Sequence, residues 1–298
     1  MYRILVIIVT YNAKKWIDKC FESVEQSTLP LDVFTIDNGS TDGTQTYIKS
    51  NYPHIIFQQN NANIGFGKAN NIGMQYAINN NYDYIYLLNQ DAWLMPDTIE
   101  KLIAIHKRNP EYGILSPYQI QANQKHLDRN FGVWVCSWDS NKDILEDMYF
   151  KREKEVYAVP GVMAAHWLIS KECLYKVGGF SPTFPHYGED NNYTNRTWYH
   201  GYKVGIVPCA KAIHDREYRA ETPEANIYKL AYIQNLVLLS TIHNSKSKQI
   251  AKTIGNIIET AFMFKSLLPF KYIYILILRY SQIKENMKNS KNSHAFLS

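Results

Sequence analysis

The sequence predicts an α/β protein: a mostly parallel sheet flanked by helices, followed by a C-terminal helical appendage. Two observations support this class. Through the first half of the chain, short apolar runs that suit buried strands alternate with segments of helical periodicity. From about residue 223 onward, long helical patterns dominate. Because parallel strands need crossover connections, the alternation favours right-handed β-α-β units.

The first predicted strand covers Ile4–Val9, an apolar run of six residues. This run is too short for the core of a signal peptide, so we interpret it as a buried strand and expect the chain to be cytoplasmic. A helix is predicted over Lys14–Gln26, with Asn12 as its cap. The same patterns predict strands over Val33–Ile36, Ile55–Gln59 and Tyr84–Leu88 and a helix over Lys68–Asn79.

The second half of the chain is less regular. From about residue 112 to residue 157, polar and aromatic residues mix without a period, and no order of elements is predicted. The elements expected beyond it are strands on either side of Pro160-Gly161, a short helix over Lys171–Lys176, a helix from Asp190 to His200 and a strand over Tyr202–Val207. The composition changes near Thr222-Pro223. We therefore predict one domain over residues 1–222, in two halves of about 1–110 and 111–222, and a helical region over residues 223–298.

Composition narrows the function. Of the 298 residues, 46% are hydrophobic and 20% are charged, as in an ordinary folded protein. The formal charge of +5 suits a phosphate-bearing ligand or an anionic membrane, and by itself it does not indicate nucleic acid. The four cysteines are scattered without a C-x-x-C pair, which argues against a zinc site or a disulfide framework.

Polar residues follow several of the predicted strands. Tyr11, Asp37, Asn63 and Asp91 each come just past a strand end. In open α/β sheets, ligands bind beyond the C-terminal ends of the strands. We therefore expect the four loops that carry these residues to converge on one cleft.

Phosphate and metal are the ligands that two of these loops suit. Asn63–Gly73 is rich in glycine and opens a helix, so its N–H groups, together with Lys68, could hold a phosphate. Asn89-Gln90-Asp91 follows an apolar strand, and an oxygen-rich loop there suits Mg²⁺ or Mn²⁺. With one acidic residue, such a site would need diphosphate oxygens to complete it. Taken singly, each loop has a structural alternative, a helix cap or a turn.

Two further motifs lie in the second half. Glu189-Asp190 opens a predicted helix, where acidic residues favour the helix N-terminus and a carboxylate could also act as a general base for a hydroxyl. His214 follows the last predicted strand. It could be a further metal ligand, or a structural histidine.

Taken in order, these motifs resemble family 2 glycosyltransferases. The motifs are Val9-Thr10-Tyr11-Asn12, Asp37–Thr44, Asn63-Ile64-Gly65-Phe66, Leu88-Asn89-Gln90-Asp91, Gly178-Gly179-Phe180 and Glu189-Asp190, followed by His214. The similarity covers residue 3 to about residue 216 and is closest to bacterial members that build rhamnose-containing or other surface polysaccharides. It implies a GT-A fold, with a nucleotide-binding half at about 1–110 and an acceptor half at about 111–222.

The resemblance also implies roles for individual residues. The binding site for the donor sugar nucleotide would be lined by Thr10, Tyr11, Asp37, Asn63, Gly65, Lys68 and Asn89. Asp91 would hold Mg²⁺ or Mn²⁺ in place of a D-x-D motif, and His214 would contact the metal or the diphosphate. Asp190 would be the catalytic base, and Glu189, Gly161 and Trp93 are expected on the acceptor side. The implied reaction is an inverting transfer from a nucleoside-diphosphate sugar to a hydroxyl of a glycan or lipid-linked acceptor.

Two departures from the family pattern leave alternatives open. The metal motif has a single acid, and Asn192 stands where the family carries a second aspartate after Glu-Asp. A degenerate member that only binds glycan or scaffolds an assembly would share both features. A sugar nucleotidyltransferase is a weaker alternative, because its Gly-rich, basic signature would have to stand where Thr10-Tyr11-Asn12-Ala13 does.

The C-terminal region predicts attachment to a membrane surface. Phe262–Tyr280 is rich in aromatic and aliphatic residues, but its longest uncharged apolar piece, Tyr272–Leu278, has seven residues. A membrane-spanning helix needs roughly 20. With basic residues around it, the segment predicts an interfacial helix on anionic lipid, peripheral on the inner face of the cell membrane. The alternative is a helix that packs on the catalytic domain or on another protomer of a homo-oligomer.

Overall fold

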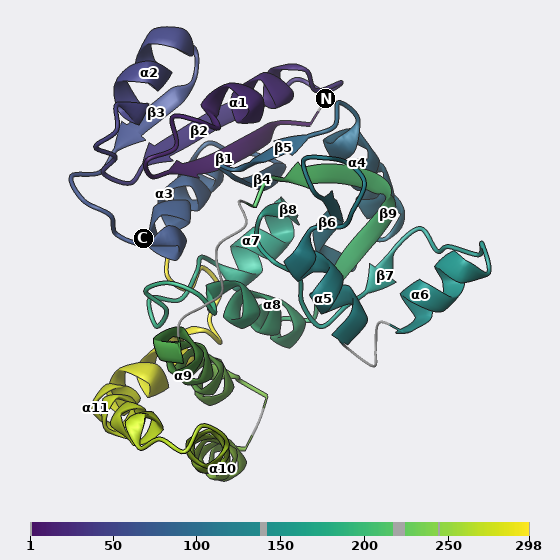
Figure 1. The fold of residues 1–298 in the computed structure, drawn as a ribbon. Coiled ribbons are helices and arrows are strands. Elements are labelled where there is room, and N and C mark those ends of the chain that lie inside the picture. Colours follow the sequence, from purple (N-terminus) through teal and green to yellow (C-terminus); the bar gives the residue numbers. More distant parts are fainter. Residues whose placement is uncertain (1, 138–141, 217–223, 244, 298) are drawn as a thin grey trace.

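The computed structural model describes residues 2–137, 142–216, 224–243 and 245–297, and its centre is a nine-stranded mixed sheet (Figure 1). The strand order is β3-β2-β1-β4-β8-β6-β9-β5, with β7 beside β9. The strands are β1 Ile4–Thr10, β2 Asp32–Asp37, β3 Ile56–Gln59, β4 Tyr84–Asn89, β5 Ala92–Leu94, β6 Tyr112–Ile120, β7 Tyr157–Ala158, β8 His166–Ser170 and β9 Lys203–His214.

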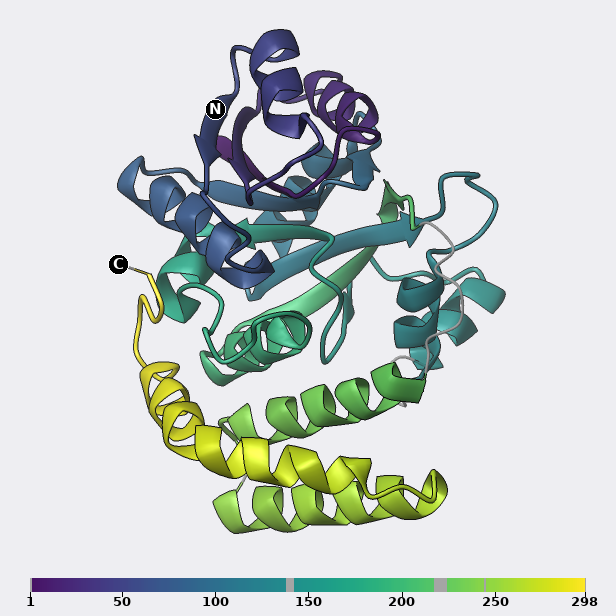
Figure 2. The same cartoon turned by 60° about the vertical axis from the view of Figure 1, so that its left-hand side comes forward.

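Helices cover both faces of this sheet, and the helices that follow residue 223 form a separate layer (Figure 2). They are α1 Ile17–Glu25, α2 Thr44–Asn51, α3 Phe66–Asn79, α4 Thr98–Arg108, α5 Arg129–Ser137, α6 Lys142–Tyr149, α7 Lys171–Val177, α8 Glu189–Tyr199, α9 Glu224–Ser240, α10 Lys246–Met263 and α11 Leu268–Asn289.

The alternation of side chains along each strand produces two cores. On β1, Leu5 and Ile7 point to a core shared with α3, α7 and α8, whereas Val6 and Ile8 point to a core shared with α1 and α4. Because strand side chains alternate between faces, a strand buried on both sides must be apolar throughout. The apolar run at Ile4–Val9 therefore reflects a central strand, as predicted.

The first four strands are parallel, and their register fixes the cleft. Thr10 pairs with Asp37 across β1 and β2, and Val9 pairs with Asn89 across β1 and β4. The C-terminal ends of these strands therefore lie at one edge of the sheet. Beyond β4 the sheet becomes mixed, because β8 runs antiparallel to both β4 and β6.

The structure confirms the predicted elements of the first half and, in the second half, the helices predicted over Lys171–Lys176 and from Asp190 to His200, which are α7 and α8. The helix after β1 begins at Ile17 and not at Lys14, and its N-cap is Trp16. Asn12, the predicted cap, has a positive φ of 51° in the preceding turn. Residues 112–157, for which no elements were predicted, contain β6, α5, α6 and the start of β7. The helix α4 was not predicted either.

The C-terminal helices α9, α10 and α11 share their own apolar core with Phe184 of the catalytic region. None of the helices in the described part of the chain combines the length and the apolar character needed to cross a membrane. The predicted boundary at Thr222-Pro223 lies outside the described residues. The division of the chain into domains stays a prediction.

Candidate active site

The ends of β1 and β2 are joined by a buried carboxylate. Asp37 is fully buried and its Oδ1 accepts hydrogen bonds from Thr10 Oγ1 at 3.0 Å and Ser40 Oγ at 2.5 Å. Its Oδ2 accepts from the Ser40 backbone N–H at 3.0 Å. Because a carboxylate can accept about four hydrogen bonds, Asp37 orders this loop and keeps capacity at Oδ2. Its role in donor binding stays a prediction.

A second set of bonds holds Tyr11 at the edge of the cleft. Gln90 Oε1 accepts from the Tyr11 N–H at 2.7 Å, and Gln90 Nε2 donates to the Tyr11 carbonyl at 3.2 Å. The loop after β4 thus clamps the backbone after β1, while the Tyr11 ring remains 45% exposed. An exposed ring on a fixed backbone is suited to stack on a flat ligand group.

The loop before α3 is ordered by two amides. Asn38 Nδ2 donates to Asn63 Oδ1 at 2.9 Å, and the same oxygen accepts from the Gly65 N–H at 2.9 Å. The Gly65 amide is therefore already bonded within the loop. Gly65 itself has a φ of 90°, and a Cβ there would lie 2.7 Å from the Pro185 carbonyl oxygen, so this position requires glycine.

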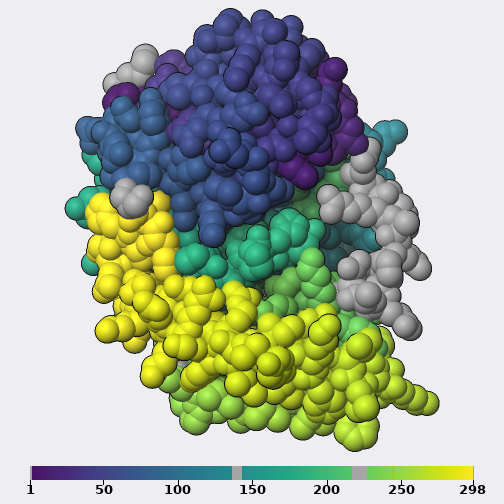
Figure 3. Space-filling view, turned by 90° about the vertical axis from the view of Figure 1, so that its left-hand side faces the viewer, coloured from purple at the N-terminus to yellow at the C-terminus, as the bar shows by residue number. Residues whose placement is uncertain are grey.

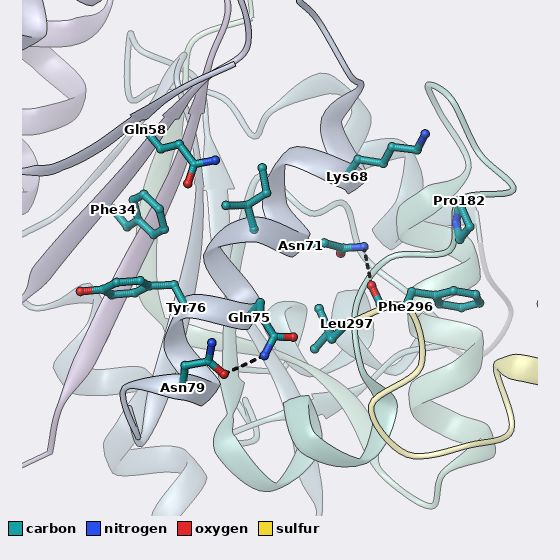
Figure 4. Close-up of a pocket in the computed structure, with 11 residues that line it drawn as sticks. Phe34, Gln58, Lys68, Asn71, Gln75, Tyr76, Asn79, Pro182, Phe296 and Leu297 are labelled. Carbon is teal, nitrogen blue, oxygen red and sulfur yellow. Dashed lines mark hydrogen bonds between the residues drawn. The ribbon is translucent and has the colours of Figure 1, made fainter. Parts of the chain in front are cut away.

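Lys68 lines a cavity beside α3. It is exposed on α3 and lines a cavity of about 560 Å³ between α3, β2 and the C-terminal tail, where its neighbours include Asn71, Gln75 and Phe296 (Figure 4). The cavity is not lined by Asp37 or Asp91. The proposed contact of Lys68 with the donor stays a prediction.

The predicted metal residues come together at the end of β9. Ala92 pairs with His214 across β5 and β9, and His214 Nε2 lies 3.5 Å from Asp91 Oδ1. The side chain of His214 is 2% exposed and that of Asp91 is 22% exposed. Burial raises the pKa of Asp91, but its hydrogen bond to His214 and the charges of His214 and Arg216 outweigh burial and lower that pKa. Asp91 is therefore ionised at neutral pH.

Asp128, which was not among the predicted site residues, extends this pair. The side chain is 1% exposed, and its Oδ2 accepts from Arg216 Nε at 3.0 Å and lies 3.9 Å from His214 Nδ1. Asp128 Oδ1 accepts from the Phe131 N–H at 2.9 Å, which caps the start of α5. The cap pattern of an aspartate three residues before an apolar residue was the available signal, and it lay in the segment for which no helix was predicted.

A second histidine, His166, lies next to His214, with the two ring centres 6.4 Å apart. His166 Nδ1 bonds the Tyr86 hydroxyl at 2.9 Å, and Nε2 bonds the Ile213 carbonyl at 3.0 Å. Burial, and then the nearby His214, lower the pKa of His166 to about 3, so the ring is neutral. His166 therefore packs as an uncharged group beneath the strand that carries His214.

Donor-side residues alone cannot complete a metal site. Among the residues that the structure describes, no group of three or more His, Cys, Asp and Glu side chains is placed to hold a metal ion. Asp91 and His214 provide one oxygen and one nitrogen that face each other, which fits two ligands of a single ion. The remaining ligands would have to come from water and from phosphate oxygens.

The two predicted acids of α8 differ in their environments. Glu189 is 7% exposed, and its Oε2 has no hydrogen-bond partner among the described residues. Asp190 is half-buried, and its Oδ1 accepts from the Asn191 N–H at 2.8 Å. Burial raises the pKa of Asp190, against the Asn191 N–H and the charge of Arg216. The positive charge of Arg216 favours the ionised form of both Asp91 and Asp190, so it contributes to lowering the pKa of Asp91 and opposes the rise in the pKa of Asp190.

Two residues predicted on the acceptor side have structural surroundings. A Cβ on Gly161 would lie 2.9 Å from Thr194 Oγ1, so glycine lets this loop approach α8 closely. Trp93 lies on β5, with the Lys19 ammonium of the α1 helix 5.0 Å from its ring centre. Neither observation tests a contact with an acceptor.

This fold is the GT-A fold, and the chain belongs to glycosyl transferase family 2. The model of that family matches residues 5–175. Family membership makes the chain a glycosyltransferase that uses nucleotide sugars, and it argues against the nucleotidyltransferase alternative.

Comparisons along the whole chain agree with this assignment. An N-acetylglucosaminyl-diphospho-decaprenol L-rhamnosyltransferase of Mycobacterium tuberculosis is 24% identical over 263 residues, which are 80% of this chain and 84% of the relative. The structure of S. aureus TarS 1-349 in complex with UDP-GlcNAc has a TM-score of 0.60 at 13% identity, covering 97% of this chain and 84% of that one. Mannosyltransferase PcManGT from Pyrobaculum calidifontis, in complex with GDP-Man and Mn²⁺, has a TM-score of 0.60 at 17% identity, with the same coverage.

Proposed function

We propose that the chain is an inverting, metal-dependent glycosyltransferase that moves a sugar from a nucleoside-diphosphate sugar to a hydroxyl of a lipid-linked or glycan acceptor. One observation supports this proposal: His214 Nε2 lies 3.5 Å from Asp91 Oδ1, and the charge of Arg216 acts on both Asp91 and Asp190. An inverting transfer needs a group for the diphosphate and a base for the acceptor at separate positions.

The residues divide the reaction between them. Asp190 takes the proton of the acceptor hydroxyl as its oxygen forms a bond to the anomeric carbon. The bond from that carbon to the diphosphate oxygen breaks, and its electron pair leaves with the nucleoside diphosphate. One displacement inverts the anomeric configuration. Asp91 and His214 would hold Mg²⁺ or Mn²⁺, which when bound neutralises charge on the leaving diphosphate.

Asp128 has a positioning part in this scheme. The Nδ1 atom of a histidine that binds a metal through Nε2 usually donates to a carboxylate or carbonyl. The carboxylate of Asp128 is the group that faces His214 Nδ1, and it also holds Arg216. Asp128 holds Arg216 by a hydrogen bond and faces His214 Nδ1 at 3.9 Å, beyond hydrogen-bond distance, and we propose that it orients both side chains.

The name of the Mycobacterium tuberculosis relative supports a proposal for the acceptor and the place of action. Its name specifies L-rhamnose transfer to an N-acetylglucosaminyl diphosphate carried on a polyprenol. We propose a nucleoside-diphosphate deoxyhexose as the first donor to test and a polyprenyl-diphosphate sugar as the first acceptor. Such an acceptor would place the enzyme at the cytoplasmic face of a membrane, in the synthesis of a surface polysaccharide.

The test measures release of nucleoside diphosphate by the full chain with a panel of sugar nucleotides and polyprenyl-diphosphate sugars. We expect release that needs both acceptor and Mn²⁺ or Mg²⁺, is lost in EDTA, and gives a product of inverted configuration by NMR. Asp91→Ala should lose metal-dependent binding of the nucleoside diphosphate in calorimetry, whereas Asp97→Ala, an exposed change nearby, should keep it. Metal-dependent binding without any transfer to any acceptor would favour the non-catalytic alternative.

A further inference from the structure

The C-terminal helices expose apolar side chains along two helices and the turn between them. On α10, Ile250, Ile254, Ile258 and Phe262 recur at every fourth position and are all exposed. This spacing places them on one side of the helix. The stripe ends at the turn into α11, where the side chains of Phe262 and Leu267 are 80% and 81% exposed. Single exposed apolar residues are ordinary, but a continuous row of them marks a contact surface.

The α11 helix continues the same surface. Phe270, Tyr274, Ile277 and Leu278 are exposed at helical spacing, while Leu276 and Ile283 on the other side are buried against the neighbouring helices. An apolar groove of about 370 Å³ between α10 and α11 is lined from both helices. We call the exposed residues 250–278 of α10, the turn and α11 the apolar face. Figure 3 shows α11 and the turn at the molecular surface, along the edge away from the N-terminal half.

Charge identifies the partner of this face. The apolar face itself contains three lysines and one glutamate, and residues 245–298 around it contain nine lysines and arginines against two glutamates, a net charge of +7 in a chain whose total is +5. The rest of the chain is therefore net acidic. Lys265 and Lys271 are exposed on either side of Leu267, and Lys252 is exposed on α10. A second copy of the same face would meet an equal positive charge, whereas an anionic surface would meet an opposite one.

We propose that the apolar face docks the protein flat on an anionic lipid surface, with the side chains of the α10–α11 turn entering the acyl boundary and the lysines contacting lipid headgroups. Amphipathic helices with aromatic and aliphatic residues on one side and basic residues beside them bind at this depth. This inference rests on the proposed function only for the acceptor that the lipid would carry. The lipid contact itself is independent of catalysis.

The structure also determines how the face should be tested. Arg279 donates to the Thr183 carbonyl at 2.6 Å, and Asn286 Nδ2 donates to Thr183 Oγ1 at 2.9 Å, so α11 packs on the catalytic region. Removing α11 would therefore disturb the catalytic region as well. Point substitutions at exposed positions avoid this problem.

The experiment is co-sedimentation of the full chain with vesicles of phosphatidylcholine containing 30% phosphatidylglycerol, and with vesicles of phosphatidylcholine alone. We expect binding to the anionic vesicles that weakens as salt rises. Phe262→Ser with Leu267→Ser should weaken it by roughly tenfold or more, since two inserted side chains return to water. Tyr149→Ser, an 80% exposed aromatic residue on α6, is the matched control and should bind normally.

A charge arm and an assembly arm complete the test. Lys265→Glu with Lys271→Glu should reduce binding at low salt, whereas Lys49→Glu with Lys107→Glu, the same charge change elsewhere, should reduce it much less. Sedimentation velocity without lipid should show a monomer for wild type and for the serine variant. A wild-type dimer that the serine variant dissociates, or equal vesicle binding by all variants, would overturn the proposal. Asp91→Ala should still bind vesicles, so a failed transfer assay and a failed lipid contact are distinguishable.

Discussion

The two adjacent carboxylates at the start of α8, Glu189 and Asp190, differ in their hydrogen bonds and in their access to solvent. Asp190 is half-buried and its Oδ1 is bonded to the Asn191 N–H, whereas Glu189 is buried with an unpartnered Oε2. Only Asp190 has the access that a base for an incoming hydroxyl needs. The residue that resembles the family's base is also the one with suitable surroundings.

Asp190→Asn is expected to keep donor affinity and to lose transfer by about 10²- to 10⁴-fold, the usual contribution of a general base. Because burial raises the pKa of Asp190, the wild-type rate should fall with decreasing pH at a pKa above the ordinary aspartate value of about 3.9. Steady-state kinetics across pH and calorimetry with donor give both readouts. Normal turnover in the variant would assign the proton to another group.

Glu189 makes a separate prediction about stability. Burial, reinforced by the charge of Asp190, raises the pKa of Glu189 to about 7. The folded state therefore holds this proton more tightly than the unfolded state, so the stability it contributes is complete below about pH 4.3 and is lost as pH rises through about 7. The wild-type free energy of unfolding should fall by up to about 3 kcal/mol from this group between pH 4.5 and 8.

Glu189→Gln should lack this part of the pH dependence. Urea unfolding of both proteins at several pH values measures it, because groups that do not interact with Glu189 contribute equally to the two curves. Curves that run parallel across the whole range would show that Glu189 titrates normally.

At the scale of elements, the C-terminal tail is a fitted part of the catalytic region. The Gly179 N–H donates to the Ala295 carbonyl at 2.8 Å, and the His294 N–H donates to the Tyr175 carbonyl at 3.1 Å. Asn71 of α3 bonds both the Phe180 and the Phe296 carbonyls. The glycines of the Gly178-Gly179-Phe180 motif are thus needed to seat the tail, a role that the family resemblance did not suggest.

Gly179→Ala should unseat this tail. The added Cβ would lie 2.5 Å from Asn71 Oδ1 and 2.7 Å from Leu297 Cδ2, and such overpacking typically costs about 1–3 kcal/mol. Chemical denaturation should show the loss, and hydrogen exchange should show faster exchange of the His294 amide. Gly255→Ala, where the added Cβ meets open space in α10, should be neutral or stabilising by up to about 1 kcal/mol.

Elements were predictable where the chain repeats a simple pattern. The parallel strands β1 and β4 are buried on both faces and were found from sequence, because such burial leaves a nearly continuous apolar run. In β2, Thr35 interrupts the run Val33–Ile36 without obscuring it. The strand β9 runs to His214, well past its predicted end at Val207. The residue after that predicted end is Pro208, and a proline inside a strand argues against its continuation. The pairing with β6 passes from Pro117 opposite Val207 directly to Tyr118 opposite Lys211. Pro208 therefore lies in a bulge of β9, outside the hydrogen-bonded ladder.

The candidate site was predictable to the extent that its residues follow strands. Asp91 and His214 were named from their positions at strand ends, and the structure brings them to 3.5 Å. Asp128 and Arg216 were not named, because their significance depends on the long-range approach of the α5 start to the end of β9. No local pattern encodes that approach.

For the whole molecule, donor binding should appear as added stability. A ligand that binds only the folded state stabilises it by RT ln(1 + [L]/Kd), about 2.7 kcal/mol at 100 Kd. Thermal unfolding with the true sugar nucleotide and Mn²⁺ should show a shift that the nucleotide with EDTA does not. A nucleoside without phosphates is the control, since it lacks the oxygens that would complete the site beside Asp91. Equal shifts with and without metal would contradict the proposed metal dependence.

The contacts of Thr183 with α11 bear on how short a fragment of this chain can be and still catalyse transfer. It receives Arg279 through its carbonyl and Asn286 through its hydroxyl, and it stands in the loop that leads to Gly188 and the acids of α8. A fragment that stops at residue 222 would contain every residue assigned to donor, metal and base. It would nevertheless lack Arg279 and Asn286, which bond Thr183 in that loop, and the C-terminal helices that neighbour α8. We expect such a fragment to bind nucleotide and fail to transfer, so the catalytic unit in practice extends to the tail.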